Sequence, residues 1–160
     1  FRSSRMEAAG NVEGLFVASA AGEPMRACAS VQLVPGVGIP NDRYAAGQGH
    51  WSDPRWPDQQ VTLVEAELCE SLWLPLDALR RNIVTRGAVL ELLIGVQFRI
   101  GSALLRGVRP CDPCRYIETL TRDGLFLDLA GRGGLRAAVI APGDVALGDA
   151  IHISPVATQP

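Results

Sequence analysis

Hydrophobic and polar residues alternate along several short segments of the chain, as they do in strands that bury one face. The clearest alternation is the sequence Val-Gln-Phe-Arg-Ile at residues 96–100. Gly101 and Ser102 follow it and suit a two-residue hairpin turn into residues 103–108. This part of the chain therefore predicts two antiparallel strands joined by a tight turn.

Weaker patterns of the same kind predict further strands at residues 12–19, 27–34, 60–64, 136–141 and 151–153. Helical spacing of apolar residues predicts short helices at residues 65–73, 76–80, 117–120 and 125–129. Turns rich in Gly and Pro separate these elements, and no regular alternation of strand and helix is present. The pattern predicts a mainly β, barrel-like fold with a few short helices.

Composition narrows the classes of function. The 160 residues suit one domain, and the formal net charge of −2 argues against nucleic acid as a partner. All basic residues are Arg, so no lysine can form a Schiff base with pyridoxal phosphate. No apolar run is long enough to span a bilayer and no signal-peptide pattern is present, so we expect a cytoplasmic protein that does not bind membranes. Residues 1–5 precede Met6, and we expect them to be vector or upstream residues.

Residues 109–115, with the sequence Arg-Pro-Cys-Asp-Pro-Cys-Arg, form the most distinctive stretch. The two prolines predict an ordered turn, and flanking arginines and a following helix start favour a thiolate at Cys114. Such a sulfur could be a metal ligand, a sulfur carrier or a nucleophile, whereas inert burial of both cysteines is equally compatible with the local sequence. A structural zinc site needs about four ligands, and the other candidates, Cys28, Cys69, His50 and His152, are not paired in sequence.

Arg80, Arg81 and Asn82 form a second candidate site. Guanidinium groups bind phosphate oxygens in a forked geometry, and the Asn amide can both donate to and accept from the edge of a polar ring. The alternative is a solvated helix end, where Arg complements the helix dipole. The three residues by themselves favour the solvated end.

Several segments, in a fixed order, resemble the MOSC domain, the C-terminal domain of molybdenum cofactor sulfurases. The matching segments are Gly38-Ile39-x-Asn41-Asp42-Arg43-Tyr44, Gln60-Val61-Thr62-Leu63-Val64-Glu65, Arg81-Asn82-Ile83-Val84, Leu92-x-x-Gly95-x-x-Phe98-x-Ile100-Gly101, Cys111-x-x-Cys114, Gly133-Gly134-Leu135-Arg136-Ala137 and Gly148-Asp149. The resemblance indicates a stand-alone, bacterial-type member and implies one MOSC domain over residues 6–160.

The resemblance also implies a β-barrel-like fold and binding of the molybdenum cofactor (molybdopterin). It implies that Cys114 is the molybdenum ligand and catalytic residue, and that Arg80 and Asn82 contact the cofactor. We expect Arg81, Asp112 and Arg115 to contribute to cofactor binding beside them. A soft thiolate at Cys114 suits molybdenum.

Two functions follow from this resemblance. The first is a reductase module for N-hydroxylated small molecules, which needs an external electron-transfer protein. The alternative is a sulfur carrier or cofactor-delivery protein that uses a Cys114 persulfide and works with a cofactor-biosynthesis protein. A third reading is a domain that has kept the fold and lost the site.

Overall fold

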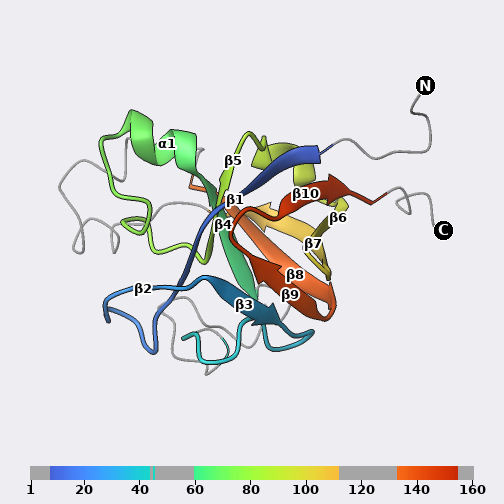
Figure 1. The fold of residues 1–160 in the computed structure, drawn as a ribbon, viewed down its shortest axis with the longest axis horizontal. Helices are drawn as coiled ribbons and strands as arrows, with labels where there is room; N and C mark the ends of the chain where they lie inside the picture. Colours follow the sequence, from blue (N-terminus) through green and yellow to red (C-terminus); the bar gives the residue numbers. More distant parts are fainter. Residues whose placement is uncertain (1–7, 44, 46–59, 112–132, 155–160) are drawn as a thin grey trace.

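The computed structural model describes residues 8–43, 45, 60–111 and 133–154, and they form a β-barrel (Figure 1). The strands are β1 (Ala8–Val17), β2 (Arg26–Ala27), β3 (Ser30–Leu33), β4 (Val61–Glu65), β5 (Ile83–Arg86), β6 (Gln97–Ile100), β7 (Ala103–Pro110), β8 (Leu135–Ala141), β9 (Gly143–Ala146) and β10 (Ala150–Ile153). The α-helix α1 (Ala66–Ser71) and the 3-10 helix η1 (Leu90–Leu93) are the helices of the described residues.

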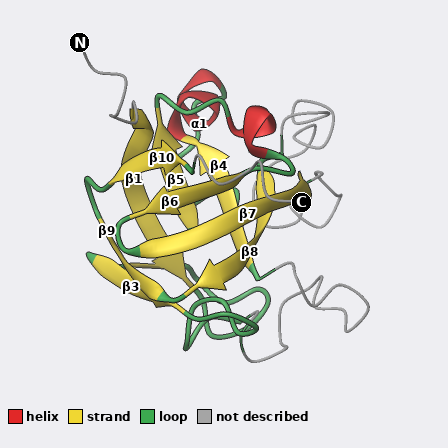
Figure 2. Ribbon diagram, turned by 90° about the vertical axis from the view of Figure 1, so that its right-hand side faces the viewer, coloured by secondary structure: helices red, strands yellow, loops and turns green. Residues whose placement is uncertain are grey.

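Seven strands close the barrel in the order β10, β6, β7, β8, β4, β5 and β1, because β1 also pairs with β10. All neighbours are antiparallel except β4 and β5, which run parallel. A parallel pair needs a crossover connection, and α1 lies in the connection between these two strands. The short β2 extends the sheet beside β1, while β3 and β9 form a separate two-stranded sheet (Figure 2).

Alternate strand residues fill the barrel. On β4, Val61 and Leu63 belong to the interior cluster, which also contains Leu135 of β8 and Phe98 of β6. Val64 points the other way and packs with Val84 and with Cys69 of α1 in a second, outer cluster. Both faces of β4 are therefore buried: the inner face by the barrel and part of the outer face by α1.

The mainly β, barrel-like prediction is confirmed, and so is the hairpin of residues 96–108, since Gln97 pairs with Arg106 and Ile100 with Ala103. The strand at 60–64 and the helix at 65–73 are also confirmed, with Cys69 fully buried as expected for a core position. The helix predicted at 76–80 is instead two overlapping turns, in which Ala78 N donates to Pro75 O and Arg80 N to Asp77 O. A five-residue segment has too few bonds to offset the entropic cost of helix nucleation. The helices predicted at 117–120 and 125–129 lie outside the described residues.

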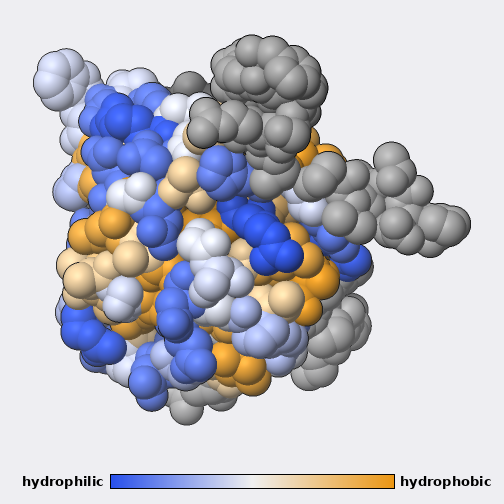
Figure 3. Space-filling model, turned by 45° about the vertical axis from the view of Figure 1, so that its right-hand side comes forward, coloured by the Kyte–Doolittle hydropathy of each residue, from blue (hydrophilic) through white to orange (hydrophobic). Residues whose placement is uncertain are grey.

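Hydrophobic side chains on the surface occur in patches between hydrophilic ones, as one face of the molecule shows (Figure 3). Trp73 is the most exposed of them, at 94%. Within the described ranges, no helix is both long and apolar enough to cross a membrane.

Candidate functional site

A row of polar residues crosses four neighbouring strands on the outer face of the barrel. Arg136 of β8 stands opposite Thr62 of β4 on one side and Arg109 of β7 on the other. Asn82, just before β5, bonds to Thr62 and extends the row. Residues directly opposite on neighbouring strands project from the same face of a sheet. The interior positions beside them are Val61, Leu63, Leu135 and Ala137, which places the row on the outside of the barrel.

Asn82 is fully buried, and its amide bonds to the protein itself. Its Oδ1 accepts hydrogen bonds from the backbone N and the hydroxyl of Thr62, at 3.1 and 3.2 Å. Its Nδ2 donates to the carbonyl oxygen of Phe16 on β1 over 3.1 Å. These bonds join β1, β4 and the start of β5, and they leave one Nδ2 hydrogen for another acceptor. The solvated helix end that the local sequence favoured is therefore wrong for Asn82.

Arg81 and Arg136 are also largely buried, with 9% and 7% of their surfaces exposed. The Nε of Arg81 donates to the carbonyl oxygen of Gly133 over 3.0 Å, and this is its side-chain bond to the described residues. Within the same described ranges, the side chain of Arg136 has neither a hydrogen bond nor an ion pair. Arg136 lies in the row on β8, and Arg81 precedes Asn82 on the far side of β4, so two largely buried cations occur near this face and favour an anionic ligand.

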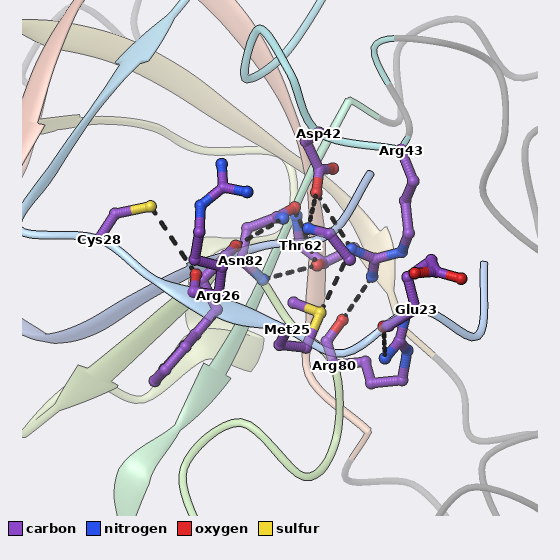
Figure 4. Close-up of polar contacts among 11 residues, drawn as sticks. Glu23, Met25, Arg26, Cys28, Asp42, Arg43, Thr62, Arg80 and Asn82 are labelled. Carbon is purple, nitrogen blue, oxygen red and sulfur yellow. Dashed lines mark hydrogen bonds and ion pairs between the residues drawn. The ribbon is translucent and has the colours of Figure 1, made fainter. Parts of the chain in front are cut away.

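The side chains of Arg80 and Arg81 bond to different segments of the chain. The Nη1 of Arg80 donates to the carbonyl oxygen of Glu23 over 2.6 Å, and its backbone has a φ of 60°, in the left-handed region. The carbonyl oxygen of Arg80 accepts a hydrogen bond of 2.7 Å from Nη2 of Arg43 (Figure 4). Arg43 is held by an ion pair of 3.1 Å with Asp42, and both are almost fully buried. The Asp42–Arg43 pair thus fixes the unusual backbone of Arg80.

Cys111 and Gly133 are the described residues on either side of residues 112–132. The backbone N of Cys111 donates to the carbonyl oxygen of Gly134 over 2.8 Å, so the two sides are held together. Because Arg81 bonds to Gly133, the candidate residues at 80–82 and the start of the cysteine turn lie at the same end of the barrel. Cys114, Asp112 and Arg115, which were predicted from the sequence, lie outside the described residues.

A pocket of about 480 Å³ lies next to this end of the barrel. Pro110 and Gly134, which adjoin Cys111 and Gly133, are part of its wall. The other residues that line it are Glu65, Glu67, Leu68, Ser71, Leu90, Glu91 and Ile94. Its volume suits a small organic molecule, and its three carboxylates and apolar side chains favour a ligand with a positive group and an apolar body.

The cysteines that the structure describes do not form a metal site. Cys28, Cys69 and Cys111 are free thiols, and the described part of the chain contains no cluster of three or more His, Cys, Asp or Glu residues suited to a metal ion. Burial raises the pKa of Cys69 to about 11, so this thiol stays protonated at neutral pH. Cys69 is therefore a poor nucleophile and a poor metal ligand.

Sequence reasoning singled out Arg80, Arg81 and Asn82 but missed Thr62 and Arg136 as parts of the same row. Thr62 lies in a strand with apolar neighbours, and Arg136 follows a Gly-Gly turn at the start of another. The sequence signal that could have found them is a polar residue between two apolar neighbours in a strand, as Thr62 is in β4 and Arg136 is in β8. The two residues belong to one row only because the strand register places Thr62 opposite Arg136.

The strands define a small β-barrel protein, and comparisons with known proteins agree with this class of fold. The family model described as the MOSC domain matches residues 56–152, and the chain belongs to this family. None of the curated proteins matches the sequence significantly.

Solved structures share the fold at low sequence identity. The YuaD protein from Bacillus subtilis is similar with a TM-score of 0.74 and 20% identity, over 90% of this chain and 94% of that one. YiiM from Escherichia coli is similar with a TM-score of 0.65 and 18% identity, over 94% of this chain and 70% of that one. YiiM from Geobacillus stearothermophilus has a TM-score of 0.61 and 15% identity, over 94% and 75% of the two chains.

MOSC domains are associated with the molybdenum cofactor, a dithiolene pterin that carries a phosphate. The described residues fit the anionic part of this group, because Arg81 and Arg136 are buried cations without an ion pair to another described residue. They would hold the phosphate by charge-assisted hydrogen bonds.

Proposed function

We propose that the protein is a molybdenum-cofactor-binding module that reduces N-hydroxylated small molecules. Cys114 is the proposed molybdenum ligand and catalytic residue, and Arg80, Arg81, Asn82, Asp112 and Arg115 are the proposed cofactor contacts. Reduction of an N–O bond consumes two electrons and two protons and releases water. An external electron-transfer protein has to supply the electrons.

One observation carries this proposal: Arg81 bonds to Gly133, and Cys111 bonds to Gly134. These two bonds bring the basic residues at 80–82 to the place where the cysteine turn begins. An anionic cofactor with a thiolate-bound metal needs both features at one place.

The described residues divide the work of binding. Arg81 offers a guanidinium to the phosphate, and Asn82 fixes the shape of the site through its bonds to Thr62 and Phe16. Arg80 adds positive charge at the edge, in a backbone conformation held by Arg43. The cofactor, when bound, supplies the redox chemistry that no protein side chain offers.

The acidic pocket supports a small-molecule substrate. It adjoins Pro110 and Gly134, and its Glu67 and Glu91 side chains are exposed. Carboxylates favour a substrate with a cationic head, such as a protonated nitrogen base, and Leu68 and Leu90 favour an apolar body. The three carboxylates disfavour the cofactor phosphate in the same pocket, so the phosphate is expected to bind elsewhere.

Metal and pterin analysis of protein from a host that makes the cofactor tests the proposal. We expect molybdenum and pterin in the wild type and loss of molybdenum in Cys114→Ser. Cys111→Ser is the matched control, and we expect it to retain more molybdenum because its buried side chain faces protein. Equal loss in both variants would favour a paired dithiol site over a single ligand.

The alternative function is a sulfur carrier or cofactor-delivery protein. A carrier would show a thiol-reversible mass gain of one sulfur at Cys114 and no turnover of N-hydroxylated compounds with an artificial electron donor. Absence of both the metal and the sulfur adduct after anaerobic preparation would leave a domain that has kept the fold and lost the site.

A further inference from the structure

We propose that the outer face of β10, β6 and β7 is a docking surface for a protein with an acidic surface. Three residues define it, Arg99, Arg106 and His152, and it is called the basic face below. The inference rests on the proposed function for the identity of the partner, which is the external electron-transfer protein. It deepens that function by naming where this partner binds.

The strand register places the basic residues next to one another. Arg99 of β6 stands opposite His152 of β10 on one side and Leu104 of β7 on the other. Arg106 lies two residues beyond Leu104, which makes it a diagonal neighbour of Arg99 at about 7–8 Å. The adjacent positions along β6 and β7 fill the barrel interior with Phe98, Ile100 and Leu105. The basic residues therefore project outward from three strands that lie side by side (Figure 2).

Carboxylates do not balance this charge. The strands β6, β7 and β10 contain neither Asp nor Glu. The exposed side chains of Arg99 and Arg106 make no hydrogen bond or ion pair with the part of the chain that the structure describes. Asp149, just before β10, instead accepts a hydrogen bond of 2.8 Å from the backbone N of Ala146. Like charges on neighbouring strand positions repel, so an acidic partner removes an unfavourable interaction.

Arg86 shows the contrast on another part of the barrel. This β5 residue bonds to Glu13 of β1 and pairs with Glu70 of α1. Carboxylates thus accompany the arginine near α1, while the basic face has none on its strands. Because the whole chain has a formal net charge of −2, the basic face reflects separation of charge and not an overall excess of cations. Such a separation favours a partner of opposite charge at this face.

Apolar side chains between the cations favour a protein as the partner. Leu104 and Val108 occupy outward positions of β7 on either side of Arg106, and both are half-buried. Arginine among apolar side chains is typical of protein–protein interfaces. The outward positions of the three strands carry no Phe, Tyr or Trp on which the bases of a single-stranded nucleic acid could stack.

The basic face also leads to the place where electrons are needed. Pro110, the last residue of β7, is four residues beyond Arg106, about 13 Å along an extended strand. Cys111 follows it and begins the turn that contains Cys114, the proposed metal ligand. A carrier that docks on the basic face therefore lies beside the strand that ends at this turn.

Poly-L-glutamate is the probe for docking, used with the full chain. We expect calorimetric titration to show binding at low salt that weakens as the salt concentration rises. Arg99→Glu and Arg106→Glu should each weaken this binding at least fivefold. The matched control is Arg26→Glu, which reverses the same charge at an exposed position of β2 and should change the affinity less than twofold. The neutral variants Arg99→Gln and Arg106→Gln keep the test decisive if charge reversal impairs folding.

Turnover with two electron donors separates docking from chemistry. A reduced plant-type ferredoxin, a small acidic iron–sulfur protein, gives one electron, so two of them supply the pair that one N–O bond consumes. We expect Arg106→Glu to lose at least fivefold in rate with ferredoxin and to keep the wild-type rate with reduced methyl viologen. A loss of the same size with both donors would overturn the proposal, because it would place the effect in the reaction and not in docking.

The binding data have equally clear contrary outcomes. No salt-dependent binding of poly-L-glutamate, equal weakening in Arg26→Glu, or tighter binding of a thymidine oligonucleotide would overturn the proposal. Binding that depends on Arg99 and Arg106 in a protein without molybdenum or turnover is the result in which the proposed function fails and the docking surface stands. Molybdenum and turnover with methyl viologen, without any dependence of poly-L-glutamate binding on these arginines, is the reverse.

Discussion

Arg81 donates a hydrogen bond from Nε to the carbonyl oxygen of Gly133, a residue 52 positions further along the chain. This bond joins the turn before β5 to the turn before β8. Gly134, the next residue, accepts a hydrogen bond from the backbone of Cys111. Three segments that are far apart in the sequence thus meet at one end of the barrel.

Gly134→Ala is expected to be strongly destabilising. Gly134 has a φ of +115°, and an added Cβ would lie 2.2 Å from the carbonyl oxygen of Leu63. Backbone would have to shift, so we expect a loss of more than about 2 kcal/mol in the free energy of unfolding and a lower molybdenum content. Denaturant unfolding and metal analysis measure the two effects.

The control for this change is Gly148→Ala. Gly148 also has a positive φ, of +87°, but an added Cβ there would meet no atom within 4 Å. We expect only the backbone cost, about 1 kcal/mol. Similar losses in the two variants would mean that the close approach to Leu63 does not constrain this end of the barrel.

Asn82→Ala is expected to lower the free energy of unfolding by about 2–4 kcal/mol, because it leaves the backbone N of Thr62 and the carbonyl of Phe16 buried without their partner. Urea unfolding monitored by circular dichroism measures the loss. Gln32→Ala, at an exposed position of β3, is the control and should change stability by less than about 0.5 kcal/mol. Equal effects would show that the Asn82 amide does not join the strands.

Because the Cys69 thiol is buried, we expect the protein to lose stability in alkali. The pKa of the folded Cys69 thiol, about 11, lies above the ordinary value of 9.0 because burial disfavours the thiolate. The stabilising contribution is therefore fully present below about pH 9 and is lost as the pH rises through about 11. The free energy of unfolding should fall by up to about 1.4 kcal/mol per pH unit in this window.

Cys69→Ala should reduce this slope while lowering stability at pH 7 through lost packing. Guanidinium unfolding at a series of pH values compares the two proteins. Rapid alkylation of Cys69 in the folded wild type at pH 8 would contradict a buried, protonated thiol.

Because Arg86 pairs with two carboxylates, we expect the protein to lose stability in acid. Arg86 binds Glu13 through two hydrogen bonds of 2.8 and 2.9 Å and also pairs with Glu70. The hydrogen bond from Arg86 holds the pKa of Glu13 below its usual value of 4.5. The contribution is present above pH 4.5 and is lost as the pH falls through the lowered folded pKa.

Because Arg86 and Glu13 are about a third exposed, we expect Arg86→Gln to lower the thermal midpoint only slightly at pH 7. The difference from the wild type should shrink at pH 3 and in 1 M salt, as thermal unfolding can show. Arg99→Gln, at an exposed position of β6, is the control. A difference that persists in acid would point to packing of the Arg86 stem and not to its charge.

The sequence by itself determined the class of fold. Alternation at 96–100 and the Gly101-Ser102 turn fix a hairpin locally, and the apolar stripe at 65–73 fixes α1, because both signals depend on residues close in the chain. The sequence-based prediction of a helix failed at residues 76–80, where the apolar spacing is helical but the segment is too short to nucleate a helix. The residues that resemble the MOSC domain identified the family before any contact was known.

Only the tertiary structure decided which polar residues act together. Arg80 and Arg81 are adjacent in sequence and look like one clamp, yet they bond to Glu23 and Gly133, on different segments. Arg136 begins a strand predicted at residues 136–141, and the structure shows that it is largely buried opposite Thr62. Sequence spacing gives the side of a strand on which a residue lies, but the register between strands and the closure of the barrel decide what stands beside it and whether water reaches it.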